Sequence, residues 1–192
     1  MAFVETGFSG LVVFEPAVFE DSRGYFFESY NSKVFSQYGI DIDFVQDNQS
    51  SSEYGVVRGL HFQLPPFAQS KLVRVLSGKI LDVGVDIRQG SATYGKVYYI
   101  ELSAENKKQL YLPKGFAHGF SVLSEKAEVL YKCDAFYNKQ SEVGILFNDP
   151  TLNIDWQISP DKIKVSDKDR DNKLLNDMIT GFVMAHEENA KK

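Results

Sequence analysis

The strongest constraint on the fold is a period of two in hydrophobicity between residues 79 and 88. One set of alternating positions is apolar and consists of Leu81, Val83, Val85 and Ile87. The other set is mixed and consists of Ile80, Asp82, Gly84, Asp86 and Arg88. This is the period of a strand whose successive side chains point to opposite faces. Ser77-Gly78 separates this strand from a second apolar run over residues 72–76, and we expect a hairpin turn there.

Further strand-like runs follow at about ten-residue spacing, with Gly and Pro between them. They are Val97 to Leu102, Gln109 to Leu112, His118 to Val122, Glu128 to Cys133 and Val143 to Phe147. The 15 Phe and 10 Tyr residues also favour pleated sheet over a helix bundle. The pattern predicts an all-β chain folded as an antiparallel sandwich or barrel.

Helix is expected only at the margins. Ser32 to Tyr38 should form one or two turns, and Leu174 to Glu188 should form a C-terminal helix before a loose tail. No internal repeat or low-complexity linker interrupts the 192 residues. We therefore expect a single domain over 1–192, with about 171–192 as the C-terminal helix and tail.

Charge and cysteine content exclude several classes of protein. The net charge is −5 with acids and bases interleaved, so no basic stripe is available for a nucleic-acid backbone. Cys133 is the only cysteine, which excludes an intramolecular disulfide and a thiolate zinc cluster and favours the cytoplasm. No stretch of about 18 apolar residues and no signal peptide is present, so we expect no membrane partner.

The segment VVRGLHFQLPP, residues 56–66, raises the question of what His61 does. The other histidines are His118 and His186. Metal-binding cupins usually place a second histidine two residues after the first, and Gln63 occupies that position here. The residues alone leave His61 open as a packed structural histidine or a catalytic base, and Gln63 argues against a metal ligand.

Two other segments combine polar and aromatic side chains. FVQDNQS, residues 44–50, is either a surface loop or the lining of a polar cavity, and FEDSRGYFFESYN, residues 19–31, alone would be an aromatic-rich edge strand. In EVLYKC, Tyr131 is in phase with Val129 and Cys133. If that face points into a barrel, Tyr131 is either a packed, hydrogen-bonded tyrosine or a proton donor.

Together these segments resemble the dTDP-4-dehydrorhamnose 3,5-epimerase family over about residues 8–170. The resemblance is carried by six segments in the family's order and spacing: FEDSRGYFFESYN, FVQDNQS, VVRGLHFQ, KLVRVLSGKILDVGVDIR, LSAENKKQLYLPKGFAHGF and EVLYKCDAFYN. It implies a cupin-like antiparallel β-barrel (jelly roll) without metal or cofactor. It also implies a homodimer in which the N-terminal strand region is often exchanged between subunits.

The resemblance implies inversion of C3 and C5 of dTDP-4-dehydro-6-deoxy-D-glucose, which gives dTDP-4-dehydro-L-rhamnose. Both carbons lie next to the C4 ketone, so loss of either proton leaves an enolate, and a base and an acid on opposite faces complete the inversion. By resemblance His61 is the base and Tyr131 the acid. Asp169 rather than its near neighbour Asp167 orients His61, and Lys71 stabilises the enolate oxygen.

The resemblance also implies residues that hold the nucleotide. Arg23 and Arg58 match positions around the diphosphate, and Tyr137 matches an aromatic that stacks on thymine. The remaining ligand positions are Glu28, Gln46, Asp47, Asn48, His118, Glu142 and Lys168. The family often has Tyr-Tyr where this chain has Phe136-Tyr137, and residues 170–192 follow no recognisable pattern.

Three rival functions stay open at the level of sequence. A sister epimerase that inverts one carbon would carry nearly the same residues. A non-catalytic nucleotide-sugar binding module would have lost the base or the acid, and both are present here. A metal-dependent cupin oxygenase is disfavoured by Gln63.

Overall fold

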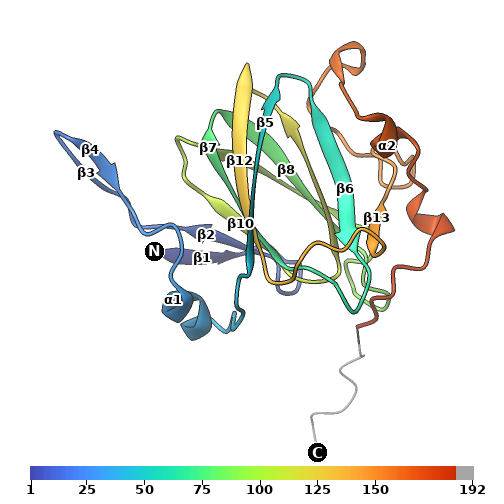
Figure 1. Ribbon diagram of the computed structural model, residues 1–192, viewed down its shortest axis with the longest axis horizontal. Helices are drawn as coiled ribbons and strands as arrows, with labels where there is room; N and C mark the ends of the chain where they lie inside the picture. The colour runs from blue at the N-terminus through green and yellow to red at the C-terminus, as the bar shows by residue number, and fades with distance from the viewer. Residues whose placement is uncertain (185–192) are drawn as a thin grey trace, which may run out of the picture.

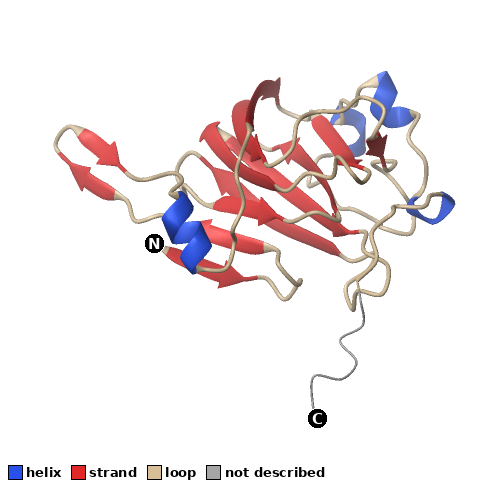
Figure 2. Ribbon diagram, turned by 60° about the horizontal axis from the view of Figure 1, so that its bottom comes forward, coloured by secondary structure: helices blue, strands red, loops and turns tan. Residues whose placement is uncertain are grey.

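The computed structural model of the protein describes residues 1–184. Two antiparallel sheets face each other, and a separate two-stranded hairpin projects from one side (Figures 1 and 2). The six-stranded sheet has the order β1 (Ala2–Glu5), β2 (Val12–Glu15), β10 (Gln109–Leu112), β7 (Lys71–Ser77), β12 (Lys126–Cys133), β5 (Gln46–Glu53). The five-stranded sheet has the order β13 (Glu142–Gly144), β6 (Val57–Gln63), β11 (Phe116–Val122), β8 (Lys79–Asp86), β9 (Val97–Ser103), and the hairpin is β3 (Phe19–Asp21) with β4 (Gly24–Phe26). The prediction of an all-β jelly roll with short helices is confirmed.

The four predicted strands between residues 97 and 133 are confirmed as β9 to β12, and the run at Val143 to Phe147 is shortened to β13. The hairpin predicted at Ser77-Gly78 is wrong. β7 pairs with β10 and β12, whereas β8 pairs with β9 and β11, so this turn carries the chain from one sheet to the other. Gly78 has φ +76°, and a side chain there would collide with the backbone carbonyl of Lys126.

Three hydrophobic clusters hold the sheets in place. One fills the space between the two sheets and includes Val73, Ile80 and Val129. The apolar face of β8, residues Leu81, Val83, Val85 and Ile87, belongs to a second cluster, in which later segments with Leu152, Trp156 and Leu175 cover the outside of the five-stranded sheet. The third lies on the outside of the six-stranded sheet and includes Phe14 and Phe35. Because the apolar face of β8 points outward, its other face is left to line the space between the sheets.

The short helices follow local capping signals. The predicted helix near residue 32 is confirmed as α1 (Ser32–Gln37), which Asn31 caps. A second helix, α2 (Asp167–Arg170), was not predicted, and Ser166 caps it. A 3₁₀ turn occupies η1 (Pro160–Lys162). In residues 1–184 no helix combines the length and apolar character that a membrane span requires.

The predicted C-terminal helix over Leu174 to Glu188 is wrong in its described part. Only the 3₁₀ turn η2 (Leu175–Asp177) forms, and residues 178–184 are not helical. Gly181 has φ +74°, and Val183 forms a bridge with Gln89, so the chain continues in an extended form against the barrel. Positions 185–188 of that prediction, and His186 among them, lie outside the described residues.

Candidate active site

A cavity of about 590 Å³ opens between the two sheets. Eight of the residues predicted from the sequence line it: Asn48, Arg58, His61, Lys71, His118, Tyr131, Lys168 and Asp169. A smaller cavity of about 270 Å³ adjoins it and adds Gln46, Tyr137 and Glu142. The two share Asn48, His61, Lys71 and Tyr131, so these four residues stand where the cavities meet.

A β-bulge in β6 allows Arg58 and His61 to line the same cavity. Residues three apart in a regular strand point to opposite faces. Here Arg58 pairs with Phe120 and His61 pairs with His118, so β6 has one residue more than β11 over this interval. Gly59 lies within the bulge at φ +124°, and a Cβ there would stand 2.5 Å from the Gly119 Cα. The two glycines allow the two strands to approach each other closely at the base of the site.

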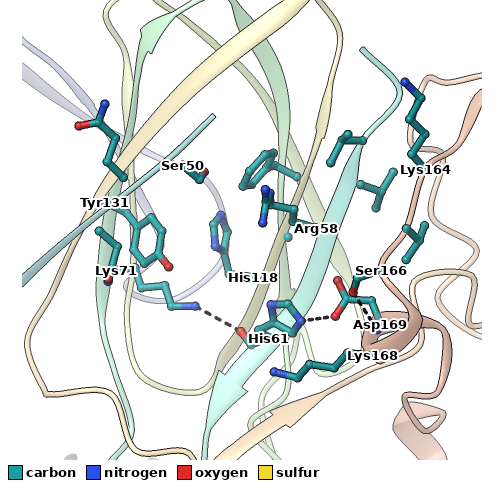
Figure 3. Close-up of a pocket in the computed structure, with 17 residues that line it drawn as sticks. Ser50, Arg58, His61, Lys71, His118, Tyr131, Lys164, Ser166, Lys168 and Asp169 are labelled. Atoms are coloured by element: carbon teal, nitrogen blue, oxygen red, sulfur yellow. Dashed lines mark hydrogen bonds and ion pairs between the residues drawn. The ribbon is translucent and has the colours of Figure 1, made fainter. Parts of the chain in front are cut away.

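His61 forms a dyad with Asp169. The His61 Nε2 lies 2.6 Å from the Asp169 Oδ1 (Figure 3). The Gly59 N–H donates to the Asp169 Oδ2 at 3.3 Å. Burial acts to raise the pKa of Asp169, but hydrogen bonds from His61, Gly59 and Ser166 outweigh it and leave the pKa below its ordinary value. The ionised carboxylate can only accept, so Nε2 is the ring nitrogen that donates to Asp169 and Nδ1 is the one left for another partner.

His118 forms a second, more deeply buried pair. Its Nε2 lies 2.6 Å from the Asp82 Oδ1, and both side chains are almost fully buried. Asp82 lies on the mixed face of β8, which the alternation pattern had separated from the apolar face. Asp82 was not among the residues selected from the sequence, although a carboxylate in that apolar strand was a visible signal.

Lys71 and Tyr131 enter from the six-stranded sheet, opposite His61 and His118. The Lys71 Nζ lies 3.4 Å from the backbone oxygen of His61 and 5.8 Å from the centre of the Tyr131 ring. Burial lowers the pKa of Lys71, and the acidic groups of Cys133, Asp82 and Glu142 offset part of that shift. Burial is also the largest cause of a raised pKa at Tyr131, so its hydroxyl keeps its proton at neutral pH.

The smaller cavity has a hydrogen-bonded rim. The Tyr137 hydroxyl donates to the Glu142 Oε2 at 2.8 Å, and the Lys168 Nζ approaches the same oxygen at 2.6 Å. The backbone N–H of Tyr137 donates to the Gln46 Oε1 at 2.9 Å. Tyr137 is 54% exposed although it lines this cavity.

Three predicted ligands lie outside both cavities of their own chain. Asp47 faces the outside of the six-stranded sheet and pairs with Lys132 at 3.0 Å. Arg23 lies in the turn of the projecting β3–β4 hairpin, where its side chain is 88% exposed and forms an ion pair with Asp21. Glu28 follows the same hairpin and accepts a hydrogen bond from Asn31.

Two serines that were not selected from the sequence, Ser50 and Ser166, also line the larger cavity. Gln63 is fully committed to the backbone, because its amide donates to Phe67 at 2.6 Å and its oxygen accepts from Asn138 at 2.6 Å. Among the described residues no three His, Cys, Asp or Glu side chains are grouped to hold a metal ion.

Residues 5–177 match the model of the dTDP-4-dehydrorhamnose 3,5-epimerase family. A dTDP-4-dehydrorhamnose 3,5-epimerase from Shigella flexneri is 52% identical over 170 residues, which cover 88% of this chain and 93% of the relative. The crystal structure of a dTDP-4-dehydrorhamnose 3,5-epimerase from Elizabethkingia anophelis is similar, with a TM-score of 0.89, 53% identity and coverage of 92% and 97%.

A dTDP-6-deoxy-D-glucose-3,5-epimerase from Legionella pneumophila, crystallised in complex with dTDP-4-keto-L-rhamnose, is also similar. The TM-score is 0.87 at 46% identity, and the match covers 91% of this chain and 93% of that one. The likeness therefore extends over the barrel and over every element that lines the two cavities.

Proposed function

Because this chain belongs to the dTDP-4-dehydrorhamnose 3,5-epimerase family, we propose that it inverts C3 and C5 of dTDP-4-dehydro-6-deoxy-D-glucose to give dTDP-4-dehydro-L-rhamnose. One observation carries the mechanism: His61 and Tyr131 enter the same cavity from opposite sheets. A sugar ring bound between them would meet a base on one face and an acid on the other. Inversion of a carbon requires this arrangement.

His61 is the base in this proposal. Its Nδ1 takes the proton from C3 or C5, and the electron pair of the broken C–H bond moves into the C4 ketone to form an enolate. Asp169 holds the imidazole in the tautomer that leaves Nδ1 free, and its negative charge stabilises the imidazolium that forms.

Lys71 and Tyr131 complete each inversion. The Lys71 ammonium stabilises the charge that develops on the C4 oxygen. Tyr131 then gives its proton to the carbon from the side opposite His61, and both groups exchange protons with solvent before the next step. The raised pKa of Tyr131 supports this role, because the hydroxyl stays protonated until the enolate approaches.

The nucleotide extends from the sugar toward the open rim. Arg58 and Lys168 bind the diphosphate, for which cationic donors are suited, and the exposed ring of Tyr137 stacks on the thymine. Gln46, Asn48, His118 and Glu142 supply further contacts from the cavity walls.

We further propose that the active protein is a homodimer whose β3–β4 hairpins are exchanged. The hairpin projects away from its own barrel (Figure 1) and exposes Phe19, Tyr25 and Phe26 by 59–68%. Exposed aromatic side chains on a projecting hairpin are stabilised when they are buried against a second subunit of the same protein. In that arrangement Arg23 and Glu28 reach the partner's cavity, and Asp47 lies at the interface. A cytoplasmic location is proposed as well, since buried Cys133 is a free thiol.

Proton NMR of the substrate in D₂O tests the activity. With catalytic amounts of enzyme, we expect the signals at both C3 and C5 to disappear as deuterium enters, and a product of inverted configuration to form. Deuterium at only one of the two carbons would assign the chain to the single-carbon epimerases. If the protein binds the nucleotide sugar but no deuterium enters at either carbon, the chain is a non-catalytic binding module.

A further inference from the structure

The interior face of β5 carries four polar side chains in a row. Residues 46 to 53 alternate between inward and exposed positions, and the inward set is Gln46, Asn48, Ser50 and Ser52. An entirely polar stripe on the inside of a barrel strand is costly unless each group has a partner. Three of the four have one: Gln46 accepts from Tyr137, Asn48 contacts the Cys133 Sγ at 3.7 Å, and Ser52 accepts from the Arg58 Nε at 3.0 Å.

Ser50 is the exception. Its Oγ is buried and has no hydrogen-bond partner among residues 1–184, yet Ser50 lines the larger cavity (Figure 3). Two other buried side-chain atoms in residues 1–184 also lack a hydrogen-bond partner, and neither is a partner for the Ser50 hydroxyl. The Asp82 Oδ2 belongs to the His118 pair, and the Asn172 Nδ2 lies on the far side of the five-stranded sheet against Gly144.

The position of Ser50 along β5 indicates which part of a sugar it meets. Asn48, one inward position earlier, pairs across the sheet with Tyr131, the proposed acid. Ser52, one inward position later, holds Arg58, the proposed diphosphate ligand. Ser50 therefore lies between the proposed acid and Arg58, one of the two proposed diphosphate ligands. The substrate carries one hydroxyl between C1 and C3, at C2.

Resting on the proposed function, we propose that Ser50 is a specificity-determining residue that hydrogen-bonds the C2 hydroxyl of the sugar. The C2 centre is not inverted, so a fixed partner can hold its hydroxyl through both inversions, whereas the C3 hydroxyl changes direction. Rotation about one bond is enough to turn the Ser50 hydroxyl between staggered positions toward a ligand. Binding then gives a partner to an atom that has none in the free protein.

Affinities for two unreactive ligands test this assignment. dTDP-6-deoxy-D-glucose has a C4 hydroxyl instead of the ketone and cannot form the enolate, and its 2-deoxy analogue lacks only the C2 hydroxyl. Calorimetry should give a preference of wild type for the 2-hydroxy ligand of about 5- to 100-fold, the range expected when one buried polar group is left unpaired. Ser50→Ala should lose that preference and bind the 2-deoxy ligand as wild type does.

Ser51→Ala, on the exposed face of the same strand, is the matched control and should keep the preference. The melting temperature of Ser50→Ala should not fall, because the substitution removes an unpaired buried hydroxyl. Equal loss of affinity for both ligands, an unchanged preference, or a clear loss of stability would each overturn the assignment. Turnover of the keto sugar is measured separately, so its absence in wild type would contradict the proposed function while the binding comparison still decides the role of Ser50.

Discussion

At the scale of single residues, the proposed acid, Tyr131, is the group most open to a direct test. Tyr131→Phe removes only the hydroxyl that would deliver the proton. We expect turnover to fall by about 10²–10⁴-fold, the usual contribution of one general acid, which corresponds to about 3–5 kcal/mol of barrier. Steady-state kinetics of this variant give the measurement.

Tyr99→Phe is a suitable control, because Tyr99 lies on the edge strand β9, partly exposed and away from the cavities. It should leave turnover unchanged. Near-normal turnover of Tyr131→Phe would remove Tyr131 from the mechanism.

The pKa shifts of Lys71 and Tyr131 predict how activity declines at alkaline pH. Lys71 must be protonated to stabilise the enolate, and burial lowers its pKa below 10.5, so its ammonium form is lost as pH rises through that lowered value. The pKa of Tyr131 shifts in the opposite direction, above 10.0, so its acid form persists to higher pH. We therefore expect kcat/KM to decline at alkaline pH because Lys71 deprotonates.

In Lys71→Arg the guanidinium stays charged, and the decline should move to higher pH even if the overall rate is reduced. Lys132→Arg, on the outside of the sheet beside Asp47, should keep the wild-type profile. If the alkaline decline of kcat/KM stays at the same pH in Lys71→Arg, a group other than Lys71 causes that decline.

At the scale of elements, the bulge in β6 positions both Arg58, the proposed diphosphate ligand, and His61, the proposed base. Sequence patterning could not find it, because the period-two rule assigns Arg58 and His61 to opposite faces. The same rule identified β8 correctly but not the side that faces the cavity, since both faces of that strand are buried. The hairpin expected at Ser77-Gly78 failed for a related reason: a glycine turn specifies a change of direction and does not specify the sheet that the next strand joins.

Gly59→Ala tests the importance of that bulge. Gly59 and Gly24 share a φ of +124°, but a Cβ at Gly24 meets no atom within 4 Å, whereas one at Gly59 meets the backbone of Gly119. Gly24→Ala should therefore cost about 1–2 kcal/mol of backbone strain. Gly59→Ala should add a steric cost of about 1–3 kcal/mol.

Urea unfolding of the two variants measures this difference. Gly59→Ala should also reduce turnover, because the Gly59 N–H donates to Asp169, which holds His61. Equal loss of stability in the two variants would show that close contact between β6 and β11 is unimportant.

At the scale of the whole molecule, eight of the residues selected by the sequence resemblance line one cavity. These residues come from β5, β6, β7, β11, β12 and α2, which no local periodicity relates. The resemblance also selected Arg23, Glu28 and Asp47, and these lie outside the cavities of their own chain. The proposed exchange of hairpins between two subunits would account for the first two.

Mixing two inactive variants tests that exchange. In a heterodimer of Arg23→Ala and His61→Ala subunits, exchange gives one site with both residues intact and one with neither. Random pairing of subunits should then restore about a quarter of wild-type activity. If Arg23 serves its own chain, every site carries one substitution and no activity returns.

A mixture of His61→Ala with Lys71→Ala is the control, because both residues line the cavity of their own chain. It should stay inactive under either arrangement. Recovery in this control would indicate that subunits exchange more than the hairpin.

The central claim is that one histidine, held by Asp169 in a cavity between the two sheets, removes the protons from both carbons. The most direct test is the rate at which deuterium enters C3 and C5 from D₂O in the presence of His61→Ala. The account predicts that exchange stops at both positions together, while the variant still binds the nucleotide sugar. Continued exchange at either carbon would identify a second base and contradict it.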